Sequence, residues 1–229
     1  MRTEDISSWS KFRERLGQYC QLPVDRRRQL IFRGQSDARW SLQTTLDRSR
    51  VFADDGLREH FFSDLLRRFR RELLQLHSGD AWRLEGDALE LMARHHGLPT
   101  PMLDWSESPF VASYFAFEHS LGELSSKVSI WVLDRAKLPD PSDFVTIIDD
   151  EALLSYNRRA IRQRGVFLRV RTVAEPLEHL LQNAITRFDL PAIEAGVALA
   201  ELDEMTITAT SMYDDMDAAA RTVSRRELI

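Results

Sequence analysis

Residues 31–40 read IFRGQSDARW, and the elements of the fold are predicted outward from this stretch. Together with the residues just before it, the apolar start predicts a short β-strand over 29–33. Arg33 and Gly34 then stand where a leucine or a valine would extend the strand. We interpret Arg33 as the end of the strand. In this interpretation its guanidinium group, a planar fork of hydrogen-bond donors, lies at the mouth of a cavity.

Two interpretations of this pair are open at the level of sequence. Arg33 can clamp an anion, beside a glycine whose bare backbone a ligand approaches closely. Alternatively, Arg33 pairs with an interior carboxylate and Gly34 only permits a turn. The first interpretation predicts a cavity beside the strand, and the second predicts a sealed core.

The composition is that of an ordinary soluble globular protein. Hydrophobic residues make up 43% of the 229 residues and charged residues 29%, which is enough apolar mass for a sizeable core. Nothing reads as a linker, so we expect one domain over residues 1–229. Because no apolar run is long enough to cross a membrane and the N-terminus lacks the apolar stretch of a signal peptide, we expect a cytoplasmic protein without membrane contact.

Charge is uneven along the chain, although the total is only −5. Residues 1–72 carry 16 Lys+Arg against 11 Asp+Glu, a balance of +5, whereas residues 196–229 carry 3 against 7, a balance of −4. The total argues against a protein that binds nucleic acid with its whole surface. The first third can attract phosphates, or its arginine clusters at 26–28 and 67–71 are solvated faces.

Helical and strand patterns occur together without strict alternation. Apolar spacing and caps predict helices over 8–20, 57–77, 87–97 with Gly97 as its C-cap, 151–163, 176–183, 191–203 and 214–226, and one that starts after Ser108. Further strands are expected over 127–134, 144–148, 166–170 and 184–188; the first is apolar on both faces and therefore central. These patterns predict the α+β class or a mixed sheet.

A second informative stretch is HHGLPTPMLDWSES at 95–108. Two prolines exclude a regular helix over 98–106, so we expect a fixed irregular loop. Neighbouring helical residues point about 100° apart, so at most one of His95 and His96 faces a site, and the pair lacks metal-ligand spacing. Fixed polar groups on a packed loop are typical of binding sites. The same residue types also cap helix ends: Thr100, Asp104, Ser106 and Glu107.

A third stretch, NRRAIRQRGVF at 157–167, brings polar groups toward another glycine and the next strand. The three stretches together resemble the FRG domain family, named for a Phe-Arg-Gly triplet that is 32–34 here. The family's first motif is similar to residues 32–48 and its second to residues 94–116. Its third, an arginine followed by QxGxF, is similar to Arg159 and 163–167.

At several positions this sequence differs from the residues that are usual in the family. Arg94 stands where the family usually has glutamine, and Met102 where it usually has leucine. The tail at 211–221 is similar to the family's closing pattern, with Tyr213 and Asp214 where Phe-Pro is common. With these differences the resemblance extends over nearly the whole chain.

The FRG family is in turn similar to the ADP-ribosyltransferase superfamily, many of whose members carry Arg-Gly on an early strand and a Ser/Thr stretch that leads into a helix. Arg33-Gly34 and residues 100–106 resemble these two features. The resemblance implies an ADP-ribosyltransferase-like α+β fold, a central mixed or split β-sheet packed by several helices, with NAD as co-substrate and no metal. The superfamily's catalytic glutamate has no counterpart, because Gly165 stands near its place.

The resemblance also implies roles for the polar residues. Arg33, supported by Gln35, holds the pyrophosphate or the adenosine ribose, and the nucleotide-binding set includes Gly34, Arg159 and Gln163. Asp104 or Glu107 supplies the negative charge that the reacting ribose needs, with Asp215 as a further candidate. His95 or His96, Thr100 and Ser106 hydrogen-bond the nicotinamide or its ribose. The ring of Tyr114 or Trp105 stacks on the nicotinamide.

Three functions fit these residues. The first is an NAD-dependent ADP-ribosyltransferase that modifies a nucleic acid or a protein, as a toxin or an anti-phage effector does, and that an inhibitory partner protein can silence. The second is a non-catalytic module that binds a nucleotide or a nucleic-acid phosphate through Arg33, Arg159 and the basic first third. In the third every motif residue is structural: Arg33 is salt-bridged to Asp104, and Trp40 and Trp105 lie in the core.

Overall fold

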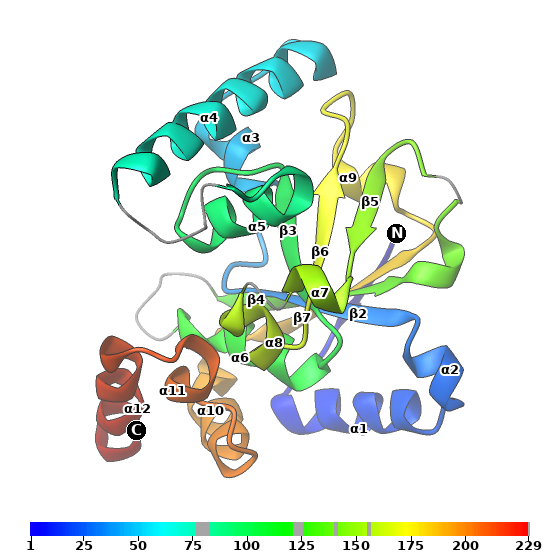
Figure 1. Ribbon diagram of the computed structural model, residues 1–229. Helices are drawn as coiled ribbons and strands as arrows, with labels where there is room; N and C mark the ends of the chain where they lie inside the picture. The colour runs from blue at the N-terminus through cyan, green and yellow to red at the C-terminus, as the bar shows by residue number, and fades with distance from the viewer. Residues whose placement is uncertain (77–82, 121–125, 140–141, 155–156, 229) are drawn as a thin grey trace.

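A mixed seven-stranded β-sheet forms the centre of the part of the chain that the structure describes (Figure 1). The computed structural model describes residues 1–76, 83–120, 126–139, 142–154 and 157–228. The strands lie in the order β1-β7-β4-β2-β3-β6-β5, and neighbours are antiparallel except β1 and β7. Their bounds are β1 (Arg2–Asp5), β2 (Leu30–Gln35), β3 (Met102–Ser106), β4 (Lys127–Asp134), β5 (Val145–Ile148), β6 (Gly165–Val170) and β7 (Ile185–Pro191).

The sheet is split between β2 and β3. All six residues of β2 pair with β4, but only Phe32 pairs with β3, opposite Ser106. From Arg33 onward the described backbones of the two strands no longer pair. The carbonyl of Asp104 accepts a hydrogen bond from Nη1 of Arg33 at 2.7 Å instead. A side chain therefore spans the gap that a backbone ladder would have closed.

Helices cover both faces of this sheet. On one face α1 (Trp9–Cys20), α6 (Pro109–Glu118) and α10 (Ala195–Glu204) bury Phe32 and Phe188. On the other face Ile31 and Trp131 pack with residues of β3, β5 and β6 and with α9 (Leu177–Leu180). The remaining elements are α2 (Val24–Arg27), α3 (Thr45–Ser49), α4 (Asp55–Gln75), α5 (Gly86–His95), α7 (Glu151–Leu154), α8 (Arg158–Arg162), α11 (Ala209–Tyr213), α12 (Met216–Leu228), η2 (Arg135–Lys137) and η3 (Ala192–Glu194).

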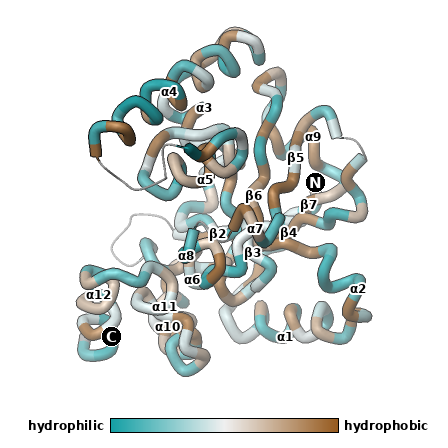
Figure 2. The backbone as a smooth tube through the Cα atoms, viewed as in Figure 1, coloured by the Kyte–Doolittle hydropathy of each residue, from teal (hydrophilic) through white to brown (hydrophobic). Residues whose placement is uncertain are grey.

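Figure 2 shows hydrophobic residues concentrated in the strands, while α4 mixes hydrophilic and hydrophobic residues along its length. This distribution places the apolar core at the sheet. Among the described helices, none combines the length and the apolar character needed to span a membrane.

Most predicted elements are confirmed, with small shifts at their ends. The helices predicted at 8–20, 57–77 and 87–97 are α1, α4 and α5, although residue 77 lies outside the described residues. Ser108 caps α6 by accepting the N–H of Val111, as predicted. The strand predicted at 127–134 is β4, and seven of its eight residues are buried. The architecture fits the predicted α+β class.

Three local predictions are wrong, and one strand was not predicted. The strand predicted to stop at Arg33 continues to Gln35, so Arg33 does not end it. The loop predicted at 98–106 contains the strand β3, because its two prolines precede the strand, where no ladder N–H is needed. The polar strand β1 was not predicted, because as an edge strand it buries little apolar surface. Within the helix predicted at 151–163, α7 and α8 are separate, and residues 155–156 lie outside the described residues.

Gly34 is required by the contact between the sheet and α6. A Cβ atom at Gly34 would lie 1.9 Å from the carbonyl oxygen of Ala112 and 2.6 Å from the nitrogen of Ala116. Both are backbone atoms of α6, so no side-chain movement can relieve the clash. The glycine is therefore explained by helix packing rather than by the close approach of a ligand.

Gly34→Ala should destabilise the fold by about 3 kcal/mol or more, because α6 would have to move off β2. Gly17→Ala is the matched control: a Cβ atom at Gly17, inside α1, meets nothing within 4 Å. There alanine should stabilise the helix by about 0.5–1 kcal/mol. Urea denaturation measures both variants, and a Gly34→Ala protein as stable as the wild type would refute the packing constraint.

Glu90 on α5 is a buried carboxyl group with incomplete hydrogen bonding. Its Oε1 accepts a hydrogen bond from Nη1 of Arg169 at 2.7 Å, while Oε2 is buried without a hydrogen-bond partner in the described structure. Burial raises the pKa of Glu90 to about 7, and Arg169 opposes that rise. The folded protein therefore keeps a proton that the unfolded chain releases near the ordinary pKa of glutamate. Stability should fall as the pH rises from about 4.5 to about 7.

Glu90→Gln, which mimics the protonated form, should raise the free energy of unfolding above that of the wild type at about pH 8, by on the order of 3 kcal/mol. Near pH 4.5 the two proteins should differ little. Urea denaturation at both pH values measures the effect, and Glu85→Gln is the control because the Glu85 side chain is 75% exposed. A difference that is the same at both pH values would contradict the assignment to Glu90.

Candidate functional site

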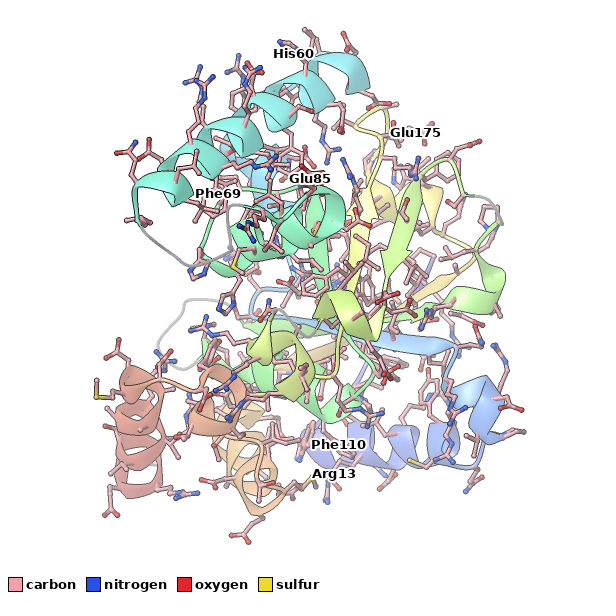
Figure 3. All side chains as sticks on the ribbon, viewed as in Figure 1. Arg13, His60, Phe69, Glu85, Phe110 and Glu175 are labelled. Carbon is pink, nitrogen blue, oxygen red and sulfur yellow. The ribbon has the colours of Figure 1, made fainter. Side chains whose placement is uncertain are left out.

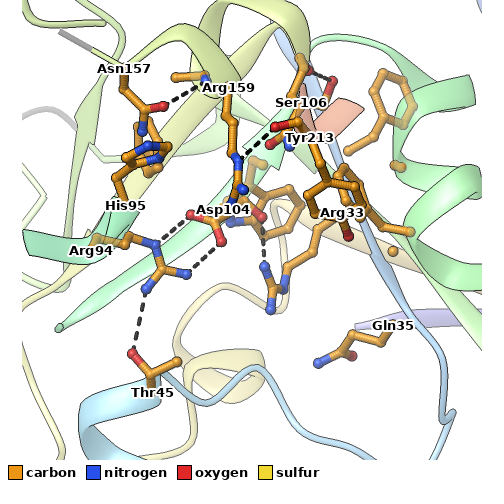
Figure 4. Close-up of a pocket in the computed structure, with 18 of the residues that line it drawn as sticks. Arg33, Gln35, Thr45, Arg94, His95, Asp104, Ser106, Asn157, Arg159 and Tyr213 are labelled. Carbon is orange, nitrogen blue, oxygen red and sulfur yellow. Dashed lines mark hydrogen bonds and ion pairs between the residues drawn. The ribbon is translucent and has the colours of Figure 1, made fainter. Parts of the chain in front are cut away.

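A cleft of about 440 Å³ opens where β2 and β3 diverge (Figure 4). Its walls come from β2, β3, α3, α5, α6, α8 and the end of α11, and we call it the Arg33 cleft. The predicted site residues that line it are Arg33, Gly34, Gln35, His95, Asp104, Ser106, Arg159 and Gln163. Segments far apart in the sequence therefore meet at the split in the sheet.

Arg33 projects into this cleft from β2 (Figure 4). Its Nη1 donates to the Asp104 carbonyl, whereas its Nε is buried and has no hydrogen-bond partner in the described structure. Burial lowers the pKa of Arg33 to about 10; Asp104 opposes this, and the cations Arg94 and Arg48 add to it. The guanidinium is charged at neutral pH and keeps unused donors. The interpretation in which it is salt-bridged to Asp104 is wrong, because the bond goes to the carbonyl.

The carboxylate of Asp104 is instead held by Arg94. Nε and Nη2 of Arg94 each lie 2.5 Å from one carboxylate oxygen, and Nη1 donates to the hydroxyl of Thr100 at 2.9 Å. The Arg94 side chain is 13% exposed, whereas that of Asp104 is 51% exposed and faces the cleft. Although burial acts in the opposite direction, Arg94 and then Arg33 hold the pKa of Asp104 below its usual range. Asp104 is therefore ionised at neutral pH, with both oxygens engaged.

The cleft has an excess of positive charge. Arg33, Arg48, Arg94 and Arg159 line it, against the single carboxylate of Asp104, a formal balance of +3 with histidines neutral. Arg48 is exposed, and its side chain makes no hydrogen bond or ion pair to the described part of the chain. Such a set favours a ligand that carries more than one negative charge.

The tail of the chain forms one wall. Arg159 donates from Nε to the carbonyl of Tyr213 at 3.1 Å and pairs with Asp215 at 3.0 Å, and Gln163 donates to the carbonyl of Met212 at 3.1 Å. The Arg159 guanidinium also lies 5.4 Å from the centre of the Tyr213 ring. α8 thereby holds the end of α11 against the cleft.

Residues 28–123 match the model of the FRG domain family. The match supports the FRG family for this stretch, which is less than half of the chain. It contains Arg33, Arg48, Arg94 and Asp104, so most of the charged lining lies in the matched residues; Arg159 and the tail lie beyond them. Comparison with curated proteins and with solved structures gives no match.

Three FRG motif residues support the cleft rather than project charge into it. Gln35 accepts a hydrogen bond from Nε1 of Trp131 at 2.6 Å and donates to the carbonyl of Ser41 at 3.0 Å, which fastens the turn after β2. Ser106 donates to the carbonyl of Gln163 at 2.7 Å, which joins β3 to α8. Burial, His96 and Arg159 lower the pKa of His95, so its imidazole is neutral at pH 7.

Four predicted residues do not line the cleft. Thr100 is buried behind Arg94, and His96 is exposed on the outside of α5. Glu107 pairs with Arg164 at 3.3 Å beyond the other end of the β2–β3 junction. Tyr114 is fully buried and donates to Glu118 at 2.8 Å. Of the paired candidates, His95 and Trp105 line the cleft.

Several lining residues were missed: Trp40, Thr45, Arg48, Arg94, Phe115, Asn157 and Tyr213. Arg48 closes the first FRG motif and Arg94 opens the second, so their place in the motifs was an available signal. Trp40 was expected in the core only in the structural interpretation, but it is 46% exposed beside the cleft. The remaining positions follow from the way distant segments pack. The described residues contain no group of three or more His, Cys, Asp or Glu arranged to hold a metal ion.

The Arg94–Asp104 pair can be tested by a double-mutant cycle. Arg94→Gln and Asp104→Asn should couple by about 1 kcal/mol or more at pH 7, because the paired geometry is two-pronged. A depressed carboxyl pKa contributes stability that is present above the unfolded value and lost as the pH falls, so the coupling should be smaller at a pH below the usual range of aspartate than at pH 7. Urea denaturation at both pH values measures it, and additive effects at pH 7 would show that the pair does not form.

Proposed function

We propose that the Arg33 cleft binds the phosphate groups of a nucleotide. The observation that carries this proposal is Arg33, a half-buried cation with a buried, unpartnered Nε and no ion pair in the described residues, next to Arg48 and Arg94. A phosphate on Arg33 would accept from the fork of donors and offset the repulsion among the arginines.

The lining supports a nucleotide rather than a free phosphate. The volume of about 440 Å³ is within the range of small-molecule sites. Trp40 and Tyr213 provide rings against which a base can stack, and the exposed carboxylate of Asp104 can accept hydrogen bonds from ribose hydroxyls. NAD combines two phosphates with two riboses and two rings, so NAD is our candidate ligand.

ADP-ribosyl transfer from NAD is a second candidate function, favoured by the presence of Asp104 in the cleft with Arg33. In this reaction the bond from ribose C1′ to nicotinamide breaks, and nicotinamide leaves with the electron pair. An acceptor nucleophile bonds to C1′ and loses a proton, which the neutral imidazole of His95 can take. Positive charge develops on the ribose, and one well-placed carboxylate contributes roughly 3 kcal/mol or more.

The ion pair of Arg94 with Asp104 distinguishes a cleft that only binds NAD from one that also transfers ADP-ribose. Its ion pair neutralises Asp104, the one carboxylate in the described lining of the cleft, so Asp104 can stabilise a cation only after Arg94 is drawn away. The phosphates of NAD are the groups that would compete for Arg94. Transfer therefore requires a rearrangement on ligand binding, whereas binding does not.

Calorimetric titration with NAD and with ADP tests the binding proposal. Arg33→Gln should weaken binding about tenfold to a hundredfold, because charge-assisted hydrogen bonds contribute about 1.5–3 kcal/mol. Arg67→Gln, on the exposed face of α4, is the control with the same change of charge, because Arg67 is 62% exposed and remote from the cleft. Equal affinity of Arg33→Gln and wild type would refute the proposal.

Release of nicotinamide from NAD, with and without a cell lysate as the source of acceptor, tests the transfer. Asp104→Asn should abolish release while the protein still binds NAD, and Glu107→Gln should leave release unchanged. A folded wild-type protein that binds NAD but releases no nicotinamide would leave the FRG domain protein as a nucleotide-binding module.

A further inference from the structure

A second basic cavity lies at the opposite end of the β2–β3 junction. It measures about 750 Å³, and we call it the α2 groove. Its distinguishing residues are Tyr19, Arg27, Arg28, Phe110, Arg135 and Arg164. Phe32 lines both cavities, and the pairs Ser106–Glu107 and Gln163–Arg164 each place one residue in the Arg33 cleft and the next in the groove. The two cavities are therefore neighbours.

The groove has unused positive charge. Arg27 and Arg28 are exposed, and neither side chain makes a hydrogen bond or an ion pair to any residue that the structure describes. Arg135 pairs with Asp149, and Arg164 pairs with Glu107, the only carboxylate in the described lining. Four arginines against one carboxylate give a formal balance of +3. Arg27 and Arg28 of the cluster at 26–28 thus line a concave site, whereas Arg26 pairs with Asp134.

Aromatic rings lie between these cations. Tyr19 and Phe110 line the groove and are both only partly buried. The Tyr19 ring stands edge-on to Phe32, with centroids 6.3 Å apart, so the rest of its surface is not covered by that contact. Figure 3 shows Phe110 beside α1, on the side of the molecule away from α4. Arginines interleaved with accessible rings are typical of sites that hold a backbone of phosphates and stack unpaired bases.

We propose that the α2 groove binds single-stranded nucleic acid. Arg27 and Arg28 contact successive phosphates, and Tyr19 or Phe110 stacks on a base. An acidic peptide would use the charges but leave the rings unmatched, and the bases of a duplex are already stacked on each other. Because the chain as a whole is negatively charged, attraction for phosphates has to come from local basic surfaces such as this groove and the Arg33 cleft.

The position of the groove indicates which class of molecule would accept the ADP-ribosyl group. A nucleotide bound beside Phe32 is next to the Arg33 cleft, so a strand in the groove is placed to receive an ADP-ribosyl group from NAD. This second step rests on the proposed function, whereas binding of the strand does not.

Fluorescence anisotropy with labelled oligothymidine and oligouridine, each about ten nucleotides long, tests the groove. Arg27→Gln combined with Arg28→Gln should weaken binding about tenfold and make the slope of log K against log salt shallower by about 1.4, the loss of two phosphate contacts. Phe110→Leu, which keeps apolar volume, should weaken binding without changing the slope. The matched control is Arg67→Gln combined with Arg68→Gln on α4, where both residues are exposed.

The controls separate the two proposals. The groove variants should retain wild-type affinity for NAD, and Arg33→Gln should retain most of the affinity for the oligonucleotide. Loss of NAD binding in Arg33→Gln together with unchanged oligonucleotide binding in the groove variants would overturn the groove and leave the Arg33 cleft intact. Oligonucleotide binding that falls equally in the α4 control would also overturn it, because a specific site would not exist. Comparison of the two oligonucleotides decides between DNA and RNA.

Discussion

The interrupted pairing between β2 and β3 is the constraint on which both cavities depend. One residue pair, Phe32 with Ser106, joins the two halves of the sheet; from Arg33 onward the two strands no longer pair, and on the other side β3 ends at Ser106. On one side the Arg33 guanidinium bridges to the Asp104 carbonyl. A backbone ladder there would leave no space for a ligand. α6 can cover the junction only because Gly34 lets its backbone approach.

Electrostatic imbalance is concentrated at this junction. Like charges are brought together in a cleft where burial, and then repulsion from Arg94 and Arg48, lower the pKa of Arg33. The structure compensates only in part through the pair of Arg94 with Asp104. Elsewhere the described core resolves such conflicts locally: the buried Arg58 has both Asp47 oxygens and the carbonyl of Val170 as partners. The contrast supports a site for an anion rather than a structural ion network.

Distant parts of the chain depend on each other at the cleft. Arg159 and Gln163 hold the carbonyls at the end of α11, which positions Tyr213 as a wall. The Tyr213 hydroxyl in turn donates to the buried carboxylate of Glu118 on α6 at 2.6 Å. α6 thus connects the packing at Gly34 to the position of the tail. Arg159 and Gln163, in the stretch 157–167, serve this connection.

The sequence by itself determined the class of fold, most helices and strands, and the residue types at the site, because periodicity and capping act over a few residues and the FRG motifs are long. It placed Arg33 and Asp104 in the candidate set. Only the tertiary structure decided that Arg33 lies within a strand, that residues 102–106 form a strand, and that Arg94 engages Asp104. It also separated Glu107 and Tyr114 from the cleft. These outcomes depend on where strands of distant sequence pair and stop pairing, and local pattern does not determine that.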